Sequence, residues 1–518
     1  MLAAAEADAQ TTVASRPATA EPPRLVVNIC IDQLRSDYLE AFMPLYCETG
    51  FKRLMAQGMV FQNASYDFTP VDRSSAIASL TTGTTPYYNG IPANEWLSRK
   101  TLRPQLCTTE QASLLTQRTN APVPSNIVVS SIADELKIAT QNGGKVYSIA
   151  TDCDAAVIGG GHSADGALWI DAMTGNWTTS TYYGKALPDW MVQYNKRNAP
   201  SQKMRTMTWR AKSDAVQNYQ YFLTPKPQKA FSYSFNGNTR YTDFLTSALI
   251  NNEITELARQ CVTSAQLGND RLTDILQLHY YAGTFRHKPV SEVTAELQDT
   301  YVRLDETISN LVVAIEKQLG KQNVLFVLTS TGYFDEQPTD YQAYKVPAGT
   351  VFINRTSNLL NMYLGALYGQ NRYVEGYKDN QIYLNHKLLE QKRLTLGQVL
   401  ERSREMLLMS DGVRDVYTAL SLSTATDPQL RLIRNGYNVD VCGDIILETA
   451  PGWKVLNEDN QQQKHWSQQG LLFPIVIYGH NVKPSVVTSP VTVGQIAPTI
   501  TKTIRIRAPN ACKNNSLY

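Results

Sequence analysis

A few side chains that could do chemistry stand beside apolar runs in this chain. Asp32 directly follows a run of apolar and β-branched residues, and His279 lies near the end of another. Arg73 and Ser74 come just before a stretch of small residues. Carboxylates and imidazoles bind metal ions, a guanidinium binds phosphate or carboxylate groups, and an activated hydroxyl can act as a nucleophile. These residue types indicate a site for an anion, a metal ion or both.

Each of these residues also has a structural interpretation. Asp32 could accept backbone N–H bonds at the end of its strand instead of binding a metal ion, and we favour this interpretation. Arg73 could form a salt bridge with Asp32 or Asp72 instead of binding an anion. His279 could join Asp32 and His465 around a single metal ion, but we favour a hydrogen-bonded core histidine. The residue types alone leave these alternatives open.

Strands that alternate with helices must position these residues. Continuous β-branched and apolar runs predict buried strands. The clearest helix is predicted over 291–319, where apolar residues recur every three or four positions and Gly320 follows. Such an alternation predicts an α/β fold with a parallel sheet and helices on both faces. The predicted strands are Arg24–Ile31, Met59–Ala64, Lys145–Ala150, Ile275–Tyr280, Asn323–Thr329 and Phe473–Tyr478.

Two stretches interrupt the alternation. Residues 165–270 are rich in Trp and polar residues, and residues 355–440 are mostly helical in pattern. We expect both to be insertions at strand ends, where α/β folds place their sites. Residues 1–23 are expected to be a signal remnant and flexible tether, because Ala and Thr dominate and Ala7-Asp8-Ala9 has the shape of a signal-peptidase site. Residues 24–518 are then expected to form one domain that carries the two insertions.

The composition excludes several classes of protein. Hydrophobic residues make up 43% of 518 residues, enough for a large core, so global disorder is excluded. A net charge of +2 without a long basic run excludes a nucleic-acid role. No run of eighteen apolar residues exists, so we expect no transmembrane segment. The low charged fraction favours export to the periplasm or cell envelope. Seven cysteines show no zinc-finger spacing, and a Cys442–Cys512 disulfide is a guess.

Six segments in a fixed order carry a family resemblance: VVNICIDQLRSDYL (26–39), GFKRLMAQGMVFQNA (50–64), SLTTGTTPYYNGIPANEWLSRKT (79–101), GGGHSADGALWIDAMTGNWTTSTYYGKALPDW (159–190), LQDTYVRLDETI (297–308) and VTVGQIAPTI (491–500). They resemble the alkaline phosphatase superfamily, in its branch of phosphate-irrepressible monoesterases and type I phosphodiesterase/nucleotide pyrophosphatases. The resemblance implies a mixed, mostly parallel sheet sandwiched by helices, with inserted cap segments. It also implies hydrolysis of phosphate esters with two zinc ions and a nucleophile at a helix N-terminus.

The resemblance assigns some of the family's site positions to suitable residues. Asp32 stands at the strand-end aspartate, and Asn94 stands at the asparagine that contacts the anion. The nucleophile position falls on Arg73, whose guanidinium cannot attack phosphorus. Ser74 would serve as the nucleophile if the loop shifted by one residue.

The other family positions have different residues. His465 lies two residues from the last histidine position and could fill it. The replaced motifs read His279-Tyr280-Tyr281-Ala282-Gly283 for D-x-x-x-H, Thr331-Gly332-Tyr333 for Asp-His-Gly, and Thr151-Asp152-Cys153 for Lys-x-Arg. Asp335 and Glu336, just after the second motif, are expected to lie in a solvated loop. Of the six metal-ligand positions, Asp32 is retained and His465 is arguable.

This loss of ligands leads to three hypotheses. We favour a catalytically silent relative, a pseudophosphatase without cofactor, which binds an envelope protein or an anionic ligand in the old pocket. The alternative is a divergent metal-dependent phosphomonoesterase or phosphodiesterase. In this alternative Ser74 and Arg73 are the catalytic residues, and Arg73 and Asn94 bind the anion. Zinc would be bound by Asp32, His279 and His465. A third hypothesis is a structural subunit of an envelope complex.

Overall fold

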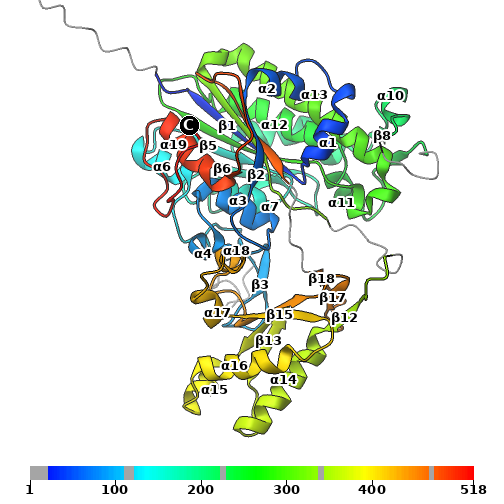
Figure 1. Cartoon of the computed structure of the whole chain (residues 1–518). Helices are drawn as coiled ribbons and strands as arrows, with labels where there is room; N and C mark the ends of the chain where they lie inside the picture. Colours follow the sequence, from blue (N-terminus) through cyan, green and yellow to red (C-terminus); the bar gives the residue numbers. More distant parts are fainter. Residues whose placement is uncertain (1–20, 110–121, 222–228, 336–343, 466–471) are drawn as a thin grey trace, which may run out of the picture.

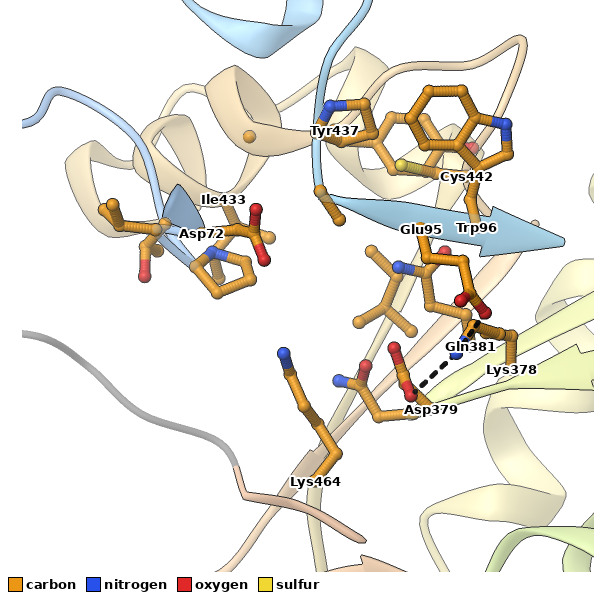
Figure 2. A pocket seen from close by; sticks show the side chains of 18 of the residues that line it. Asp72, Glu95, Trp96, Lys378, Asp379, Gln381, Ile433, Tyr437, Cys442 and Lys464 are labelled. Carbon is orange, nitrogen blue, oxygen red and sulfur yellow. Dashed lines mark hydrogen bonds and ion pairs between the residues drawn. The ribbon is translucent and has the colours of Figure 1, made fainter. Parts of the chain in front are cut away.

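The computed structural model describes residues 21–109, 122–221, 229–335, 344–465 and 472–518. Its centre is a ten-stranded sheet of order β20-β2-β19-β11-β1-β10-β5-β6-β7, in which β21 pairs with β2. The expected α/β class with a mixed, mostly parallel sheet is confirmed (Figure 1). The strands are β1 (Leu25–Asp32), β2 (Met59–Ser65), β5 (Val146–Ile149), β6 (Gly166–Ile170), β7 (Trp177–Thr179), β10 (Asp274–Tyr281), β11 (Val324–Ser330), β19 (Phe473–Gly479), β20 (Ser485–Val487) and β21 (Val491–Thr492).

The strand β1 lies in the middle of this sheet, and all of its residues are buried. It pairs in parallel with β10 on one side and β11 on the other, so Asp32 and Tyr281 end neighbouring strands. A strand that is covered on both faces favours apolar residues, which is why β1 is apolar except at Asn28 and Asp32. The strand β19 pairs antiparallel with β11 and with β2, which makes the sheet mixed.

Helices cover both faces of the sheet, and each face has its own apolar layer (Figure 1). On one face lie α1 (Ser36–Ala41), α2 (Phe51–Gln57), α12 (Leu249–Ser264) and α13 (Thr294–Leu319). On the other lie α3 (Arg73–Thr82), α6 (Ile132–Ala139), α7 (Cys153–Gly160) and α19 (Ile496–Thr503). The predicted long helix is α13, and Gly320 follows its last residue.

Residues 349–465 form a second lobe with its own apolar cluster, in the lower part of Figure 1. Its four-stranded sheet contains β13 (Val374–Lys378), β14 (Gln381–Leu384), β15 (Val413–Thr418) and β16 (Ile445–Thr449), and its three-stranded sheet contains β12 (Gly349–Phe352), β17 (Trp453–Leu456) and β18 (Gln463–His465). Its helices are α14 (Ile353–Tyr368), α15 (His386–Gln391), α16 (Leu396–Leu407), α17 (Ala419–Ser423) and α18 (Pro428–Gly436). We propose that this lobe contains the insertion expected at 355–440.

The other expected insertion, at 165–270, also stays a proposal. In the structure this stretch begins with the edge strands β6 and β7 and ends with α12, which packs against β10 and α13. Between them lie α8 (Asp189–Asn198), α9 (Pro200–Lys203), β8 (Thr208–Arg210), α10 (Asp214–Gln217), β9 (Ser232–Ser234) and α11 (Arg240–Leu245). The remaining short elements of the body are α4 (Pro86–Asn89), β3 (Glu95–Leu97) and β4 (Pro104–Leu106).

The structure also bears on the predicted disulfide, the expected absence of a transmembrane segment and the N-terminal tether. All seven cysteines are free, so the guessed Cys442–Cys512 disulfide is wrong. Cys442 is buried in the second lobe, whereas Cys512 lies against Gly83 at the end of α3. Within the described residues, no helix combines the length and the apolar character that a membrane crossing needs. Of the expected tether, residues 1–20 lie outside the described part of the chain.

A row of polar side chains crosses the sheet beneath α7. Asn28, Gln277 and Ser148 are register neighbours on β1, β10 and β5, and His279 lies two residues after Gln277. All four side chains are buried, and seven of their polar atoms have no hydrogen-bonding partner in the described part of the protein. The helix passes close to this row at Gly159, where an added Cβ would lie 2.4 Å from Nε2 of His279.

Replacing Gly159 by alanine should therefore destabilise the protein. Alanine normally stabilises a helix relative to glycine by about 1 kcal/mol. Here the new methyl group would also lie 2.7 Å from Oγ of Ser148, and overpacking of this kind costs about 1–3 kcal/mol. Urea unfolding should show a lower midpoint. The control is Gly397→Ala on α16, where the nearest atom is 3.4 Å from the added Cβ, so stability should stay unchanged or rise slightly. Equal stability of the two variants would refute the close approach of α7.

Candidate active site at the carboxyl ends of the strands

Arg73 is the first residue of α3, and the start of this helix is fixed by a capping box. The Asp72 carboxylate accepts a hydrogen bond from the Ser74 backbone N–H at 2.9 Å, and the Ser75 hydroxyl accepts one from the Asp72 backbone N–H at 2.9 Å. Such a box satisfies the free N–H groups of the first turn. The Arg73 guanidinium lies near two carboxylates, with Nη1 3.0 Å from Asp152 and 4.0 Å from Asp32.

The two carboxylates beside Arg73 come from the ends of different elements. Asp32 ends β1, is 8% exposed, and accepts a hydrogen bond from the Thr331 hydroxyl at 2.7 Å. Asp152 caps α7 by accepting a bond from the Ala155 N–H. Burial raises the pKa of Asp32 to about 6, although the nearby Arg73 charge opposes this rise. The predicted salt bridge between Arg73 and Asp32 therefore exists, and Arg73 forms a closer one, not predicted from the sequence, with Asp152.

A histidine–carboxylate pair lies near these groups. His287 Nδ1 is 2.7 Å from Asp335 Oδ2, and Gln33 holds the same carboxylate by donating from Nε2 at 2.9 Å. Asp335 does not lie in a solvated loop as expected, since its side chain is only 15% exposed. The hydrogen bond to Asp335 raises the pKa of His287 above its ordinary value. Burial alone would raise the pKa of Asp335, but the bond and charge of His287 hold it below its ordinary value.

Arg286 adds a second guanidinium. Its Nε and Nη2 donate to the Asp243 carboxylate at 2.8 and 2.7 Å, and its Nη1 has no hydrogen-bonding partner among the described residues. Arg286, His287 and Gln33 all have left-handed backbone angles, with φ of 56°, 52° and 62°. Each such residue costs on the order of 1–3 kcal/mol and persists where the surroundings hold it, which is frequent at functional sites.

These groups surround a cavity of about 410 Å³, which we call the Arg73 cavity. Its lining comes from the segments that follow β5 and β10, from α11 and from the start of α3. The volume lies in the usual range for small-molecule sites. The position, outside the carboxyl ends of the strands, is where α/β sheets bind ligands. The lining residues are Arg73, Thr151, Asp152, Thr242, Asp243, Leu245, Thr246, Tyr281, Arg286 and His287.

The other predicted site residues lie elsewhere. Ser74 is fully buried, and its hydroxyl donates to Asn94 Oδ1 at 3.2 Å, so these two candidates do meet. Neither of them lines the Arg73 cavity. His279 lies in the polar row beneath α7, where burial lowers its pKa to about 4. The backbone of His465 lies on β18 and pairs with Lys454, while its side chain is outside the described part.

The donor set does not fit two zinc ions. Among the described side chains, no three His, Cys, Asp or Glu residues converge in a group that could hold a metal ion. Zinc in proteins takes about four ligands in a tetrahedral arrangement. Asp32 and Asp152 instead face the Arg73 guanidinium, and the Asp335 carboxylate is bound by His287. The catalytic steps proposed below therefore use side chains of this chain alone.

Sequence reasoning missed four residues of the cavity region. Asp152 was interpreted only as part of the replaced Lys-x-Arg motif, and Asp335 was predicted to lie in a solvated loop. Arg286 and His287 were not considered, although they follow β10 by five and six residues. The available signal was the position of these two residues just after the strand that carries His279, because the carboxyl ends of parallel strands meet at one edge of the sheet.

The His287–Asp335 pair gives a direct pH prediction. Replacing Asp335 by asparagine should lower the pKa of His287 towards its ordinary value, because the hydrogen bond that the imidazole donates to the Asp335 carboxylate is the main cause that raises it. An NMR titration of the imidazole C–H signals measures this change. The pair stabilises the folded protein fully below the unfolded pKa of His287, and this contribution is lost as pH rises through the higher folded value. An unchanged pKa in the variant would refute the pairing, and His162, which pairs with Asp134, serves as the internal control.

A family model, several relatives and a solved structure all match this chain and agree on one family. The model of type I phosphodiesterase/nucleotide pyrophosphatase matches residues 26–470. The chain is 26% identical to alkaline phosphatase PafA of Elizabethkingia meningoseptica, over 94% of this chain and 92% of the relative. It is 26% identical to alkaline phosphatase PhoV of Synechococcus elongatus, over 95% and 92%. A protein of Myroides odoratus named calcium-transporting ATPase is 29% identical over 95% and 93%. The crystal structure of wild type PafA matches with a TM-score of 0.80 at 25% identity, over 96% and 99% of the chains.

These relatives correct our leading functional prediction. We expected a catalytically silent protein, but relatives that match almost the whole chain are named alkaline phosphatases, and a solved PafA structure shares its fold. The alternative of a divergent hydrolase agrees better with these findings. The comparisons also give no support to the expectation that the protein lacks a cofactor.

Proposed function

Because this chain belongs to the type I phosphodiesterase/nucleotide pyrophosphatase family of the alkaline phosphatase superfamily, we propose that it is a divergent phosphoric ester hydrolase. The reaction takes place in the Arg73 cavity. The observation that carries the proposal is the convergence of two guanidiniums and a carboxylate-paired imidazole on one cavity at the carboxyl ends of the strands. The names of the relatives support the reaction class.

Substrate binding relies on the donors of the cavity wall. A guanidinium recognises phosphate oxygens with paired N–H bonds, and each arginine here keeps nitrogen atoms that its carboxylate partner does not use. Arg286 presents Nη1, and Arg73 presents the nitrogens other than Nη1. The hydroxyls of Thr151, Thr242 and Thr246 lie in the same wall, but they already donate to Asp152 and to backbone carbonyls, so the two guanidiniums carry the binding of the phosphate oxygens. This role for Arg73 keeps the anion-binding assignment made from the sequence.

His287 moves the proton in this proposal. Its Nδ1–H donates to Asp335, and its Nε2 has no partner among the described residues, so Nε2 can accept a proton from a water molecule. The water oxygen forms a bond to phosphorus as the bond to the ester oxygen breaks, and the ester oxygen leaves with the electron pair. The protonated imidazole, stabilised by Asp335, then returns its proton to the leaving group. Arg73 and Arg286 stabilise the charge on the phosphoryl oxygens.

We also propose that the protein is exported to the periplasm or cell envelope. The low charged fraction and the motif Ala7-Asp8-Ala9 support this proposal.

The test is the hydrolysis of 4-nitrophenyl phosphate and bis(4-nitrophenyl) phosphate by the purified chain. We expect turnover of at least one ester, inhibition by inorganic phosphate, and a KM about tenfold higher for Arg286→Gln, since a charge-assisted bond contributes about 1.5–3 kcal/mol. The control is Arg402→Gln, which removes an exposed arginine that pairs with Glu405 on α16. Absence of turnover of both esters would refute the proposal.

A further inference from the structure

Arg73 has an unusual concentration of negative charge around it. Nη1 lies 3.0 Å from Asp152 and 4.0 Å from Asp32, and the charges of Asp154 and Asp72 also act on the guanidinium. Together these carboxylates raise the pKa of Arg73 although burial opposes the rise. Of these four carboxylates, Asp152 and Asp32 are the two that form ion pairs with the guanidinium in the described part of the protein. The guanidinium is thus the cation that Asp32 and Asp152 share.

Separate elements of the backbone position these two carboxylates independently of Arg73. Asp32 is fixed at the end of β1, which pairs on both sides within the sheet, and the Thr331 hydroxyl orients its carboxylate. Asp152 is fixed as the cap of α7. Asp32 is buried, whereas the Asp152 side chain is 27% exposed. A buried carboxylate beside a second carboxylate is unfavourable without a nearby positive group, and the Arg73 guanidinium supplies that charge. Carboxylate oxygens are also the ligands that hard divalent cations prefer.

We propose that the Arg73 guanidinium is a tethered cation that takes the place of a divalent metal ion between Asp32 and Asp152. Removing the guanidinium converts this pair of carboxylates into a site for a hard divalent cation such as Mn²⁺. In the native protein the same charge is supplied by the chain itself, so binding of an anionic ligand in the Arg73 cavity does not require added metal. This inference concerns cation binding and stands apart from the proposed hydrolysis.

Calorimetric titration with Mn²⁺ tests the proposal without any activity measurement. We expect no binding to the native chain, binding to Arg73→Ala, and no binding to Arg73→Lys, which keeps a positive charge on a shorter side chain. The double variant Arg73→Ala, Asp152→Asn should bind Mn²⁺ at least tenfold more weakly than Arg73→Ala alone, because one of the two carboxylates is gone.

Two results would overturn the proposal. One is binding of Mn²⁺ to the native chain with an affinity equal to that of Arg73→Ala, and the other is no binding to Arg73→Ala. If the alanine variant does not fold, Arg73→Met replaces it, since methionine keeps much of the apolar length of the side chain without its charge. With this variant a rise of the thermal midpoint on addition of Mn²⁺ is expected, and an unchanged midpoint counts against the proposal. If the protein does not hydrolyse phosphate esters, the calorimetric titration and the thermal midpoint with Mn²⁺ still test this proposal.

Discussion

Replacement of His287 by alanine is expected to lower kcat for an aryl phosphate about 100- to 10,000-fold, the usual contribution of a positioned general base. The imidazole lines the Arg73 cavity, and Asp335 holds its Nδ1 at 2.7 Å. Because the proton transfer matters in the transition state, KM should change much less than kcat. Steady-state kinetics with 4-nitrophenyl phosphate gives both constants. The variant should also lose the pH dependence that follows the titration of the imidazole.

His386→Ala is the matched control for this variant. His386 is also half-exposed, also has a raised pKa, and also pairs with a carboxylate, at 2.8 Å from Asp444. It lies on α15 in the second lobe and does not line the Arg73 cavity. Activity of this control should stay within about twofold of the native value. Equal loss in both variants would show that folding, and not proton transfer, explains the effect at His287.

Replacement of Asp299 by alanine should cause the largest loss of stability among the variants considered. Asp299 lies on α13 and is fully buried. Its carboxylate accepts bonds from Trp209 Nε1 at 2.6 Å, from the Lys212 N–H at 2.7 Å and from Arg303 Nε at 2.6 Å. The alanine variant leaves these donors without their acceptor, and breaking such a buried pair costs about 3–5 kcal/mol.

Urea unfolding monitored by tryptophan fluorescence measures this loss, and Asp415→Ala is the control. Asp415 pairs with Arg404 on the surface at 3.1 Å, with both side chains more than a third exposed. Exposed pairs of this kind contribute about 0–1 kcal/mol. A loss at Asp299 no larger than that at Asp415 would contradict the role of the buried carboxylate in joining β8 to α13.

Much of the fold could be predicted from the sequence because buried strands leave a continuous apolar pattern. The predicted strands Arg24–Ile31 and Ile275–Tyr280 agree with β1 and β10 to within one residue at each end. The direction of a strand leaves no such pattern. The run at Phe473–Tyr478 was correctly predicted as a strand, but nothing in it indicated that β19 runs antiparallel to its neighbours.

The candidate site was predictable in part, for a physical reason. Asp32 and Arg73 stand at the ends of regular elements, so their position follows from the strand and helix patterns. Arg286 and His287 reach the cavity through a left-handed turn, and Asp335 is held by the side chain of Gln33, 302 positions earlier in the chain. Such long-range contacts of loops have no local sequence signal.

The polar row beneath α7 has a consequence for the interior of the molecule. Asn28, Gln277, Ser148 and His279 carry seven buried polar atoms that no other described side chain or backbone group satisfies. Polar atoms in that situation recruit internal solvent, typically as ordered molecules that each make about three hydrogen bonds. We therefore expect ordered water beside these atoms, between the sheet and α7, and magnetic relaxation dispersion would detect it as slowly exchanging molecules.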